Sequence, residues 1–154
     1  MFRVLVGGFI CGVFAVLVFH QGTQFLLYHN LSMLNALTTV PEGLRPPDAG
    51  FVFRLVPPLR VPYLLTLCFF GGVWGLLLAS VIRYSHFPDL ITGLLFGAVI
   101  CSMAGFSYVP GTRTVPFWDF EFSAVWAQHA IINGAWGWGA AGVMRALGIT
   151  DDRP

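Results

Sequence analysis

The chain carries very little charge. Of its 154 residues only 10% are charged and 56% are hydrophobic, and the mean hydropathy is +0.76. Soluble domains usually carry about 25% charged residues, so this chain has too few to cover a water-soluble surface. Its formal net charge of +1 gives no sign of the basic patch that is typical of nucleic-acid binding. We therefore expect a lipid bilayer as the main partner and no nucleic acid.

Lysine is absent and cysteine is scarce. All eight basic residues are arginine, which we read as a compositional bias of the source. The three cysteines, Cys11, Cys68 and Cys101, lie in apolar stretches and form no C-x-x-C pair. Buried cysteine usually behaves as a small hydrophobic residue, so a disulfide-exchange role is not expected.

Familiar catalytic motifs are also missing. The sequence holds no Gly-rich phosphate loop, no H-E-x-x-H and no G-x-S-x-G. The carboxylates nearest to the apolar stretches, Asp89, Asp119 and Glu121, lie at their edges, which counts against a proton relay inside a membrane. The sequence favours a protein that is not an enzyme and needs no metal.

Four apolar stretches are long enough to cross a bilayer, for which a helix needs about 20 mainly apolar residues. They cover residues 4–28, 62–82, 90–108 and 122–147. They predict an all-α polytopic membrane protein, folded as a four-transmembrane-helix bundle in a single domain over residues 1–154. Gly148 is well placed to end the last helix.

The connections between these spans differ. Residues 83–89 form a tight turn, so the second and third spans should be antiparallel neighbours. The connection 29–61 is rich in proline, which fixes φ and removes a donor, so a regular helix is not expected there. Its apolar residues 51–53, 55 and 56 predict that it lies on the bilayer surface or folds over the bundle mouth. The connection 109–121 holds aromatic residues typical of the headgroup level.

The arginines favour a cytoplasmic location for both termini. An even number of spans puts both chain ends on one side. Arg3, Arg83 and Arg145 lie close to span ends on that side, whereas Arg60 and Arg113 lie on the other. The positive-inside rule counts basic residues near span ends, so it predicts that the N- and C-termini are inside and that both long connections are outside.

Small residues recur at four-residue spacing in the spans. Lipid gives helices no hydrophobic drive to associate, so close backbone approach matters, and small residues permit it. The residues expected to pack helices are Gly8, Gly12, Gly71, Gly75, Gly93, Gly97, Gly134 and Gly137. They can pack the four helices on one another or dock a partner chain, and we favour the first use.

Polar side chains gather in the first and last spans. His20 lies eight residues before Tyr28, and His129 lies seven residues after Phe122, which puts both roughly 10–12 Å below one surface. Polar groups inside a membrane usually face the protein interior or carry function. The residues expected to form a polar interhelical network are His20, Gln21, Gln24, Gln128, His129 and Asn133.

This network admits three interpretations. The first is interhelical hydrogen bonding, at about 0.6 kcal/mol per bond. The second is a cofactor site for haem b, with His20 and His129 as axial ligands. The third is a polar pathway or quinone-type pocket. We favour the first, under which no cofactor is expected.

Four short motifs lie in the spans and in the proline-rich connection. They are Val18-Phe19-His20-Gln21-Gly22, then Pro57-Pro58-Leu59-Arg60-Val61-Pro62 followed by Gly71-Gly72-Val73-Trp74-Gly75, and Asn133-Gly134-Ala135-Trp136-Gly137. They resemble a family of small four-span bacterial inner-membrane proteins of about this length, whose activity is uncharacterised. The resemblance covers most of the chain and implies a bacterial inner-membrane location. It implies no activity, and it marks His20, Gln21 and Gly22 as positions to test.

These observations predict a small, non-enzymatic integral membrane protein. Its expected role is that of an accessory or structural subunit, which packs against a larger membrane complex or against copies of itself. The alternative is a haem-b-binding electron-transfer or membrane-anchor subunit that uses His20 and His129. A small transporter or channel is the third hypothesis.

Overall fold

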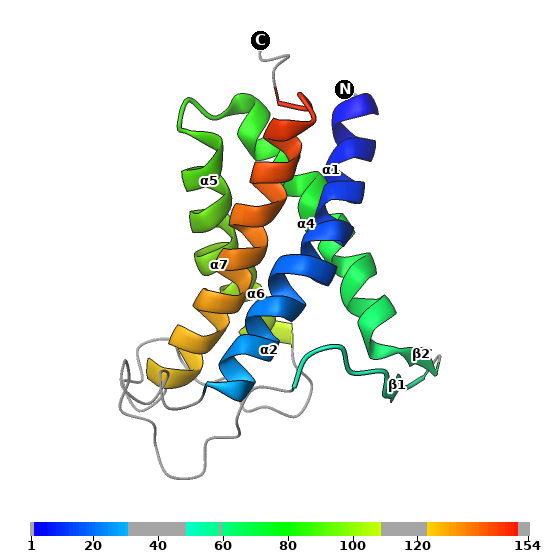
Figure 1. Cartoon of the computed structure of the whole chain (residues 1–154). Coiled ribbons are helices and arrows are strands. Elements are labelled where there is room, and N and C mark those ends of the chain that lie inside the picture. Colours follow the sequence, from blue (N-terminus) through cyan, green and yellow to red (C-terminus); the bar gives the residue numbers. More distant parts are fainter. Residues whose placement is uncertain (1, 31–48, 59, 109–122, 151–154) are drawn as a thin grey trace.

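The described part of the chain is mainly helical, with one short hairpin (Figure 1). The computed structural model describes residues 2–30, 49–58, 60–108 and 123–150. Its helical segments are α1 (Phe2–Ala15), the π-helical η1 (Val16–His20), α2 (Gln21–His29), α4 (Tyr63–Tyr84), α5 (Asp89–Leu95), the π-helical η2 (Phe96–Cys101), α6 (Ser102–Tyr108) and α7 (Ser123–Ala146). The segments α1, η1 and α2 follow one another without a break, and so do α5, η2 and α6. The described residues therefore form four helices, and the all-α prediction is confirmed.

Two of these helices are long and apolar enough to cross a membrane. They are Phe2–His29 and Tyr63–Tyr84, in which a window of 18 residues has a mean hydropathy of 2.4 and 2.1, respectively. The apolar helix Asp89–Gly105 is shorter. The polar residues Gln128, His129 and Asn133 lie within α7. Length and composition therefore support membrane association for this part of the chain.

The bundle has two distinct ends (Figure 1). The terminal end carries the start of α1, the end of α7 and the turn between α4 and α5. The hairpin end carries the end of α2, the start of α7 and the antiparallel strands β1 (Leu55–Val56) and β2 (Val61–Pro62). The strands pair Leu55 with Pro62 and Val56 with Val61. The predicted aromatic belt at 109–121 lies outside the described residues, and so does much of the proline-rich connection.

Glycine lets the helices approach as two close pairs. Along the α1–α4 contact, a Cβ on Gly8 would lie 2.8 Å from the carbonyl oxygen of Gly75. A Cβ on Gly12 would lie 2.9 Å from the Cα of Gly75 and against the carbonyl oxygen of Gly71. Real Cβ atoms do not approach backbone so closely. The α1–α4 contact therefore depends on glycine on both helices.

The second pair joins the α5–η2 helix to α7. A Cβ on Gly93 would lie 2.6 Å from the Cβ of Ala141 and against the carbonyl oxygen of Gly137. A Cβ on Gly97 would lie against the carbonyl oxygen of Asn133. Gly134 is different, because a Cβ there would lie 3.3 Å from the side chains of Ala98 and Leu94. Most of the predicted packing glycines thus lie at contacts between helices of the same chain.

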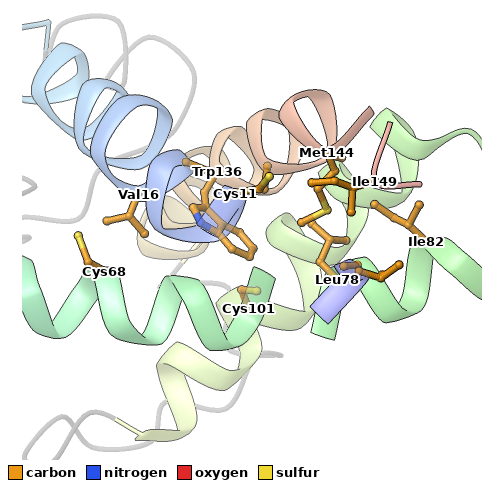
Figure 2. Packing of buried hydrophobic residues seen from close by; sticks show 14 of the residues in the cluster. Cys11, Val16, Cys68, Leu78, Ile82, Cys101, Trp136, Met144 and Ile149 are labelled. Carbon is orange, nitrogen blue, oxygen red and sulfur yellow. The ribbon is translucent and has the colours of Figure 1, made fainter. Parts of the chain in front are cut away.

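The buried core connects these two pairs (Figure 2). Trp136, 3% exposed, extends from α7 and donates a hydrogen bond from Nε1 to the carbonyl oxygen of Gly12, 3.0 Å away. Cys11, Cys68 and Cys101 are buried free thiols, as the sequence predicts. Toward the terminal end the core is completed by Leu78, Ile82, Met144 and Ile149.

The last described residues fold back onto the terminal end. Gly148 has φ +61° at the end of α7, and the Ile149 amide donates to the carbonyl oxygen of Met144 over 2.9 Å. This is the glycine-dependent helix stop that the sequence predicts. Ile149 then packs against Gly7 of α1. Thr150 Oγ1 donates to Asp89 Oδ2 over 3.0 Å, and both residues are buried. The turn after α7 therefore ties α1 and α5 together.

Candidate functional site

The candidate site lies at the hairpin end, where η1 and α2 pack against α7. Its residues reach the interior because of a change in helix geometry. The buried residues of α1 include Val4, Gly8 and Ala15, and a straight α-helix would continue this face through Val18 and Leu26. Those two residues are 46% and 61% exposed instead.

The π-helical segment η1 explains this difference. A π turn inserts one residue into an α-helix, so it shifts the residues that follow around the helix axis. After η1 the buried residues of α2 are Gln21 and Gln24, which are 1% and 9% exposed. Two glutamines therefore occupy the position that an apolar face would otherwise fill. π segments of this kind are frequent at functional sites.

Gln21 is the centre of the polar contacts. Its Nε2 lies 3.1 Å from His20 Nδ1 and donates to Gln24 Oε1 over 3.2 Å. Its Oε1 accepts a hydrogen bond from the backbone amide of Phe51. The Gln21 amide is therefore used on both its oxygen and its nitrogen, and it links the helix to a segment 30 residues away.

That segment forms a backbone strap, which we define as residues 49–54. A Cβ on Gly50 would lie 3.0 Å from the carbonyl oxygen of Gln21 and 3.3 Å from the Cβ of Phe25. Gly50 and Phe51 both have positive φ, +79° and +51°. A left-handed conformation costs a residue other than glycine roughly 1–2 kcal/mol, so the contact with Gln21 holds Phe51 in a strained conformation. The strap belongs to the connection 29–61, and the position of that connection on the bilayer surface or over the bundle mouth stays a prediction.

The structure also brings His20 and His129 together. They are close enough for a charge on one ring to act on the other. Gln128 is 9% exposed and shares the interior face of α7 with Ile132 and Trp136, which are also buried. Five of the six predicted network residues therefore lie in this region. We call His20, Gln21, Gln24, Gln128 and His129 the polar cluster.

Asn133 belongs to another contact. Its Nδ2 donates to Ser102 Oγ over 3.1 Å, and Ser102 Oγ donates to the carbonyl oxygen of Gly97 over 3.4 Å. This chain of hydrogen bonds follows the close contact between η2 and α7. Ser102 is fully buried but was not among the predicted residues, because a lone serine in an apolar stretch carries no spacing signal.

The hydrogen bonds fix the chemical state of His20. Because the Phe51 amide donates to Gln21 Oε1, the Gln21 nitrogen must face His20 Nδ1. An amide nitrogen only donates, so Nδ1 must be an acceptor without a proton. A neutral imidazole carries one proton, which is then on Nε2. His20 is therefore held as the neutral Nε2–H tautomer.

This tautomer bears on the haem hypothesis. A histidine that binds iron through Nε2 uses the lone pair of that nitrogen, and its Nδ1–H usually donates to a second group. In the arrangement observed here, His20 has its proton on Nε2 and an amide donor at Nδ1. The observed tautomer of His20 therefore fits an iron ligand poorly, and the haem site stays a prediction. A Soret band in the detergent-extracted protein would support that prediction.

Few groups for acid–base chemistry surround the polar cluster. Asp89 is the one carboxylate side chain among the described residues, and it lies at the terminal end with Thr150. Among the same residues, no three His, Cys, Asp or Glu side chains gather as metal ligands. The cluster is suited to hydrogen bonding and to taking up a proton on histidine.

A second feature lies on the outside of α7. It is a groove of about 530 Å³, open on one side and almost entirely apolar, lined by Leu94, Ala127, Ala130, Ile131, Ala135 and Trp138. Leu94 belongs to α5 and the other residues to α7. Trp138 also touches Phe19 of η1, with 6.1 Å between ring centroids. The groove therefore follows α7 between its two neighbouring helices.

No protein-family model, curated protein or solved structure matches this chain. The family resemblance of its short motifs stays a prediction, and function must be argued from the geometry.

Proposed function

We propose that this chain is a non-enzymatic, four-span protein of the bacterial inner membrane, which serves as a structural or accessory subunit. Large apolar side chains are exposed on all four helices, for example Ile10, Phe69, Ile91 and Ile131. Lipid is the solvent that suits such a surface. The start of α1 and the end of α7 lie at one end of the bundle, as an even number of spans requires.

The groove on α7 is the observation that carries the accessory role. The space beside the glycines of α1, α4 and α5 is already occupied by other parts of the same chain. The groove instead exposes small residues to the surroundings, where Ala127, Ala130 and Ala135 make a low floor. A small-residue surface lets a second transmembrane helix approach closely. The groove is therefore the docking face for a partner helix.

The occupant that we propose is a second copy of the chain. All copies in a membrane share one orientation, so a twofold axis along the membrane normal brings identical faces together. The groove suits such pairing, because it holds both a floor of alanines and projecting side chains. Ile131 and Trp138 are 38% and 46% exposed beside that floor. In the dimer, Ile131 of each copy packs over the alanines of the other.

A photo-crosslinking experiment in native membranes tests this proposal. A benzophenone amino acid replaces Ile131 in the groove and, as a matched control, Ile10, which is 60% exposed on α1. We expect a crosslinked homodimer from position 131 and none from position 10. Ala130→Trp, which fills the groove, should abolish the product.

Other outcomes would count against the proposal. A groove-dependent crosslink to one different protein would overturn the homodimer and assign the groove to a larger complex. Crosslinks from position 131 to lipid alone would overturn the docking role. Equal dimer yields from both positions would show that the contact is random collision.

A further inference from the structure

We infer that His20, Gln21 and the strap form a proton-operated latch, in which a proton on His20 turns the Gln21 amide over and releases the strap. The inference rests on the hydrogen bonds of Gln21 and is independent of the groove on α7. It gives the hairpin end two states, one with the strap bound to α2 and one with it detached.

In the bound state every contact of the Gln21 amide is satisfied. Its oxygen accepts from the Phe51 amide, and its nitrogen donates to His20 Nδ1 and to Gln24 Oε1. Gln21 is 1% exposed, so no water competes for these bonds. The arrangement requires neutral His20, because Nδ1 can accept only while it carries no proton.

A proton from the solvent at the hairpin end changes this pattern. It binds to the lone pair of Nδ1, and His20 becomes an imidazolium with N–H groups on both nitrogens. Two donors, His20 Nδ1–H and Gln21 Nε2–H, then face each other. Rotation of the Gln21 amide by half a turn removes the conflict, since Oε1 now accepts from Nδ1–H. Hydrogen bonds from a charged donor are stronger than those between neutral groups, so this new bond prevails.

The strap loses its bond in the same rotation. The Gln21 nitrogen takes the place of the oxygen, and it meets the Phe51 amide as donor against donor. Gln24 can follow, because its own amide can turn to donate to the new position of Gln21 Oε1. Phe51 has φ +51°, so detachment also relieves a left-handed conformation. Both effects favour release of residues 50 and 51 from the helix.

Several titratable groups lie on the helices around His20. The elements that pack against η1 are α1, α2, α4 and α7. We consider the described residues of these elements in the half of the bundle near the hairpin, and those of the strap. Their titratable side chains are Cys11, Tyr28, His29, Arg54, Tyr63, Cys68 and His129. Of these, His129 is the one whose ring is close enough to act on that of His20.

Hydrogen–deuterium exchange of the full chain in nanodiscs tests the latch. Protection of the Phe51 amide, corrected for intrinsic exchange, is followed from about pH 7.5 to about pH 3.5, a range that extends well below the ordinary pKa of histidine. We expect protection in the wild type to fall roughly two- to tenfold in acid, the effect of losing one hydrogen bond. In His20→Asn the side-chain oxygen can accept from Gln21 at every pH, so protection should not change.

His129→Asn is the matched control. It removes the neighbouring histidine and leaves His20, Gln21 and the strap unchanged, so acid release should persist. Acid release that survives in His20→Asn would overturn the inference, and so would a wild type without acid release. Should His20→Asn fail to fold, the ¹⁵N spectrum of His20 in the wild type decides. A neutral ring protonated on Nδ1 would contradict the latch, whereas one protonated on Nε2 would support it.

Discussion

The indole nitrogen of Trp136 lies 3.0 Å from the carbonyl oxygen of Gly12 and donates a hydrogen bond to it. The bond joins the two close helix pairs, since Gly12 packs against Gly71 and Gly75 on α4 while Trp136 belongs to α7. A Cβ on Gly71 would lie 3.5 Å from the same indole nitrogen. Three helices therefore meet at this position without room for larger side chains.

Trp136→Phe removes the donor and keeps an aromatic ring. We expect the free energy of unfolding in detergent to fall by about 0.6 kcal/mol for the bond, and by up to about 1.7 kcal/mol in a favourable site. The smaller ring adds a packing loss because the site is buried. Trp138→Phe, two residues away on an exposed part of α7, is the control and should cost less. Equal losses in both variants would show that the Gly12 contact adds nothing.

Gly12→Ala tests the close approach of α1 and α4. The added methyl would lie against the Gly71 carbonyl oxygen and 2.9 Å from the Cα of Gly75, so the helices must separate. Overpacking of this kind costs roughly 1–3 kcal/mol in the free energy of unfolding. The control is Gly22→Ala in the same helix, where a Cβ meets no atom within 4 Å. That variant should be neutral or stabilising by up to about 1 kcal/mol, because alanine favours helix.

Thermal or denaturant unfolding in detergent separates these two variants. If Gly12→Ala proved as stable as Gly22→Ala, the close contact between α1 and α4 would not be needed for stability.

Thr150→Val tests the fold-back at the terminal end. The substitution keeps the side-chain shape and removes the hydroxyl that donates to Asp89 Oδ2. A buried acceptor that loses its donor costs about 1–3 kcal/mol. Exchange of the amides of residues 147–150 should also become faster, because the turn is less firmly held. Thr150→Ser keeps the hydroxyl and should lose much less. A loss of similar size in both variants would assign the effect to the methyl group.

Much of the helical framework could be predicted from the sequence. The helices begin and end within two residues of the predicted stretches, because long apolar runs and Gly148 define them well. Glycine spacing also marked the positions where α1 meets α4 and where α5 and η2 meet α7. The spacing did not indicate which helices would pair, since every span carries small residues.

The contacts inside the candidate site were harder to predict. His20 and His129 drew attention because they are polar residues within apolar spans. Their distances from the span ends placed both at a similar depth in the membrane. The bond from Phe51 to Gln21 is invisible in sequence, because its donor is a backbone amide and carries no side-chain signal. Asn133 was grouped with His129 by its i+4 spacing, yet tertiary packing gives it Ser102 as a partner. Helical spacing shows which side chains share a helix face, but the neighbouring helix determines which hydrogen-bond partner each of them has.

The π segment η1 was not predicted either, and it leads to a sharp test. A π turn contains one residue more than the α-helix needs. Deleting Val18, which is 46% exposed within η1, should therefore restore a regular α-helix and leave Gln21 and Gln24 pointing inward. We expect a folded protein that keeps protection at the Phe51 amide, measured by hydrogen–deuterium exchange at neutral pH.

Deletion of Ile10 is the matched control. Ile10 is exposed in the same continuous helix but lies in α1, where no extra residue is available to absorb the loss. Its removal rotates Gly8 by about 100° relative to Gly12, at 3.6 residues per turn, and breaks the contact with Gly71 and Gly75. This variant should lose folded protein by size-exclusion chromatography, while the Val18 deletion should not. Equal damage in both would mean that η1 is not a one-residue insertion and that another cause turns the glutamines inward.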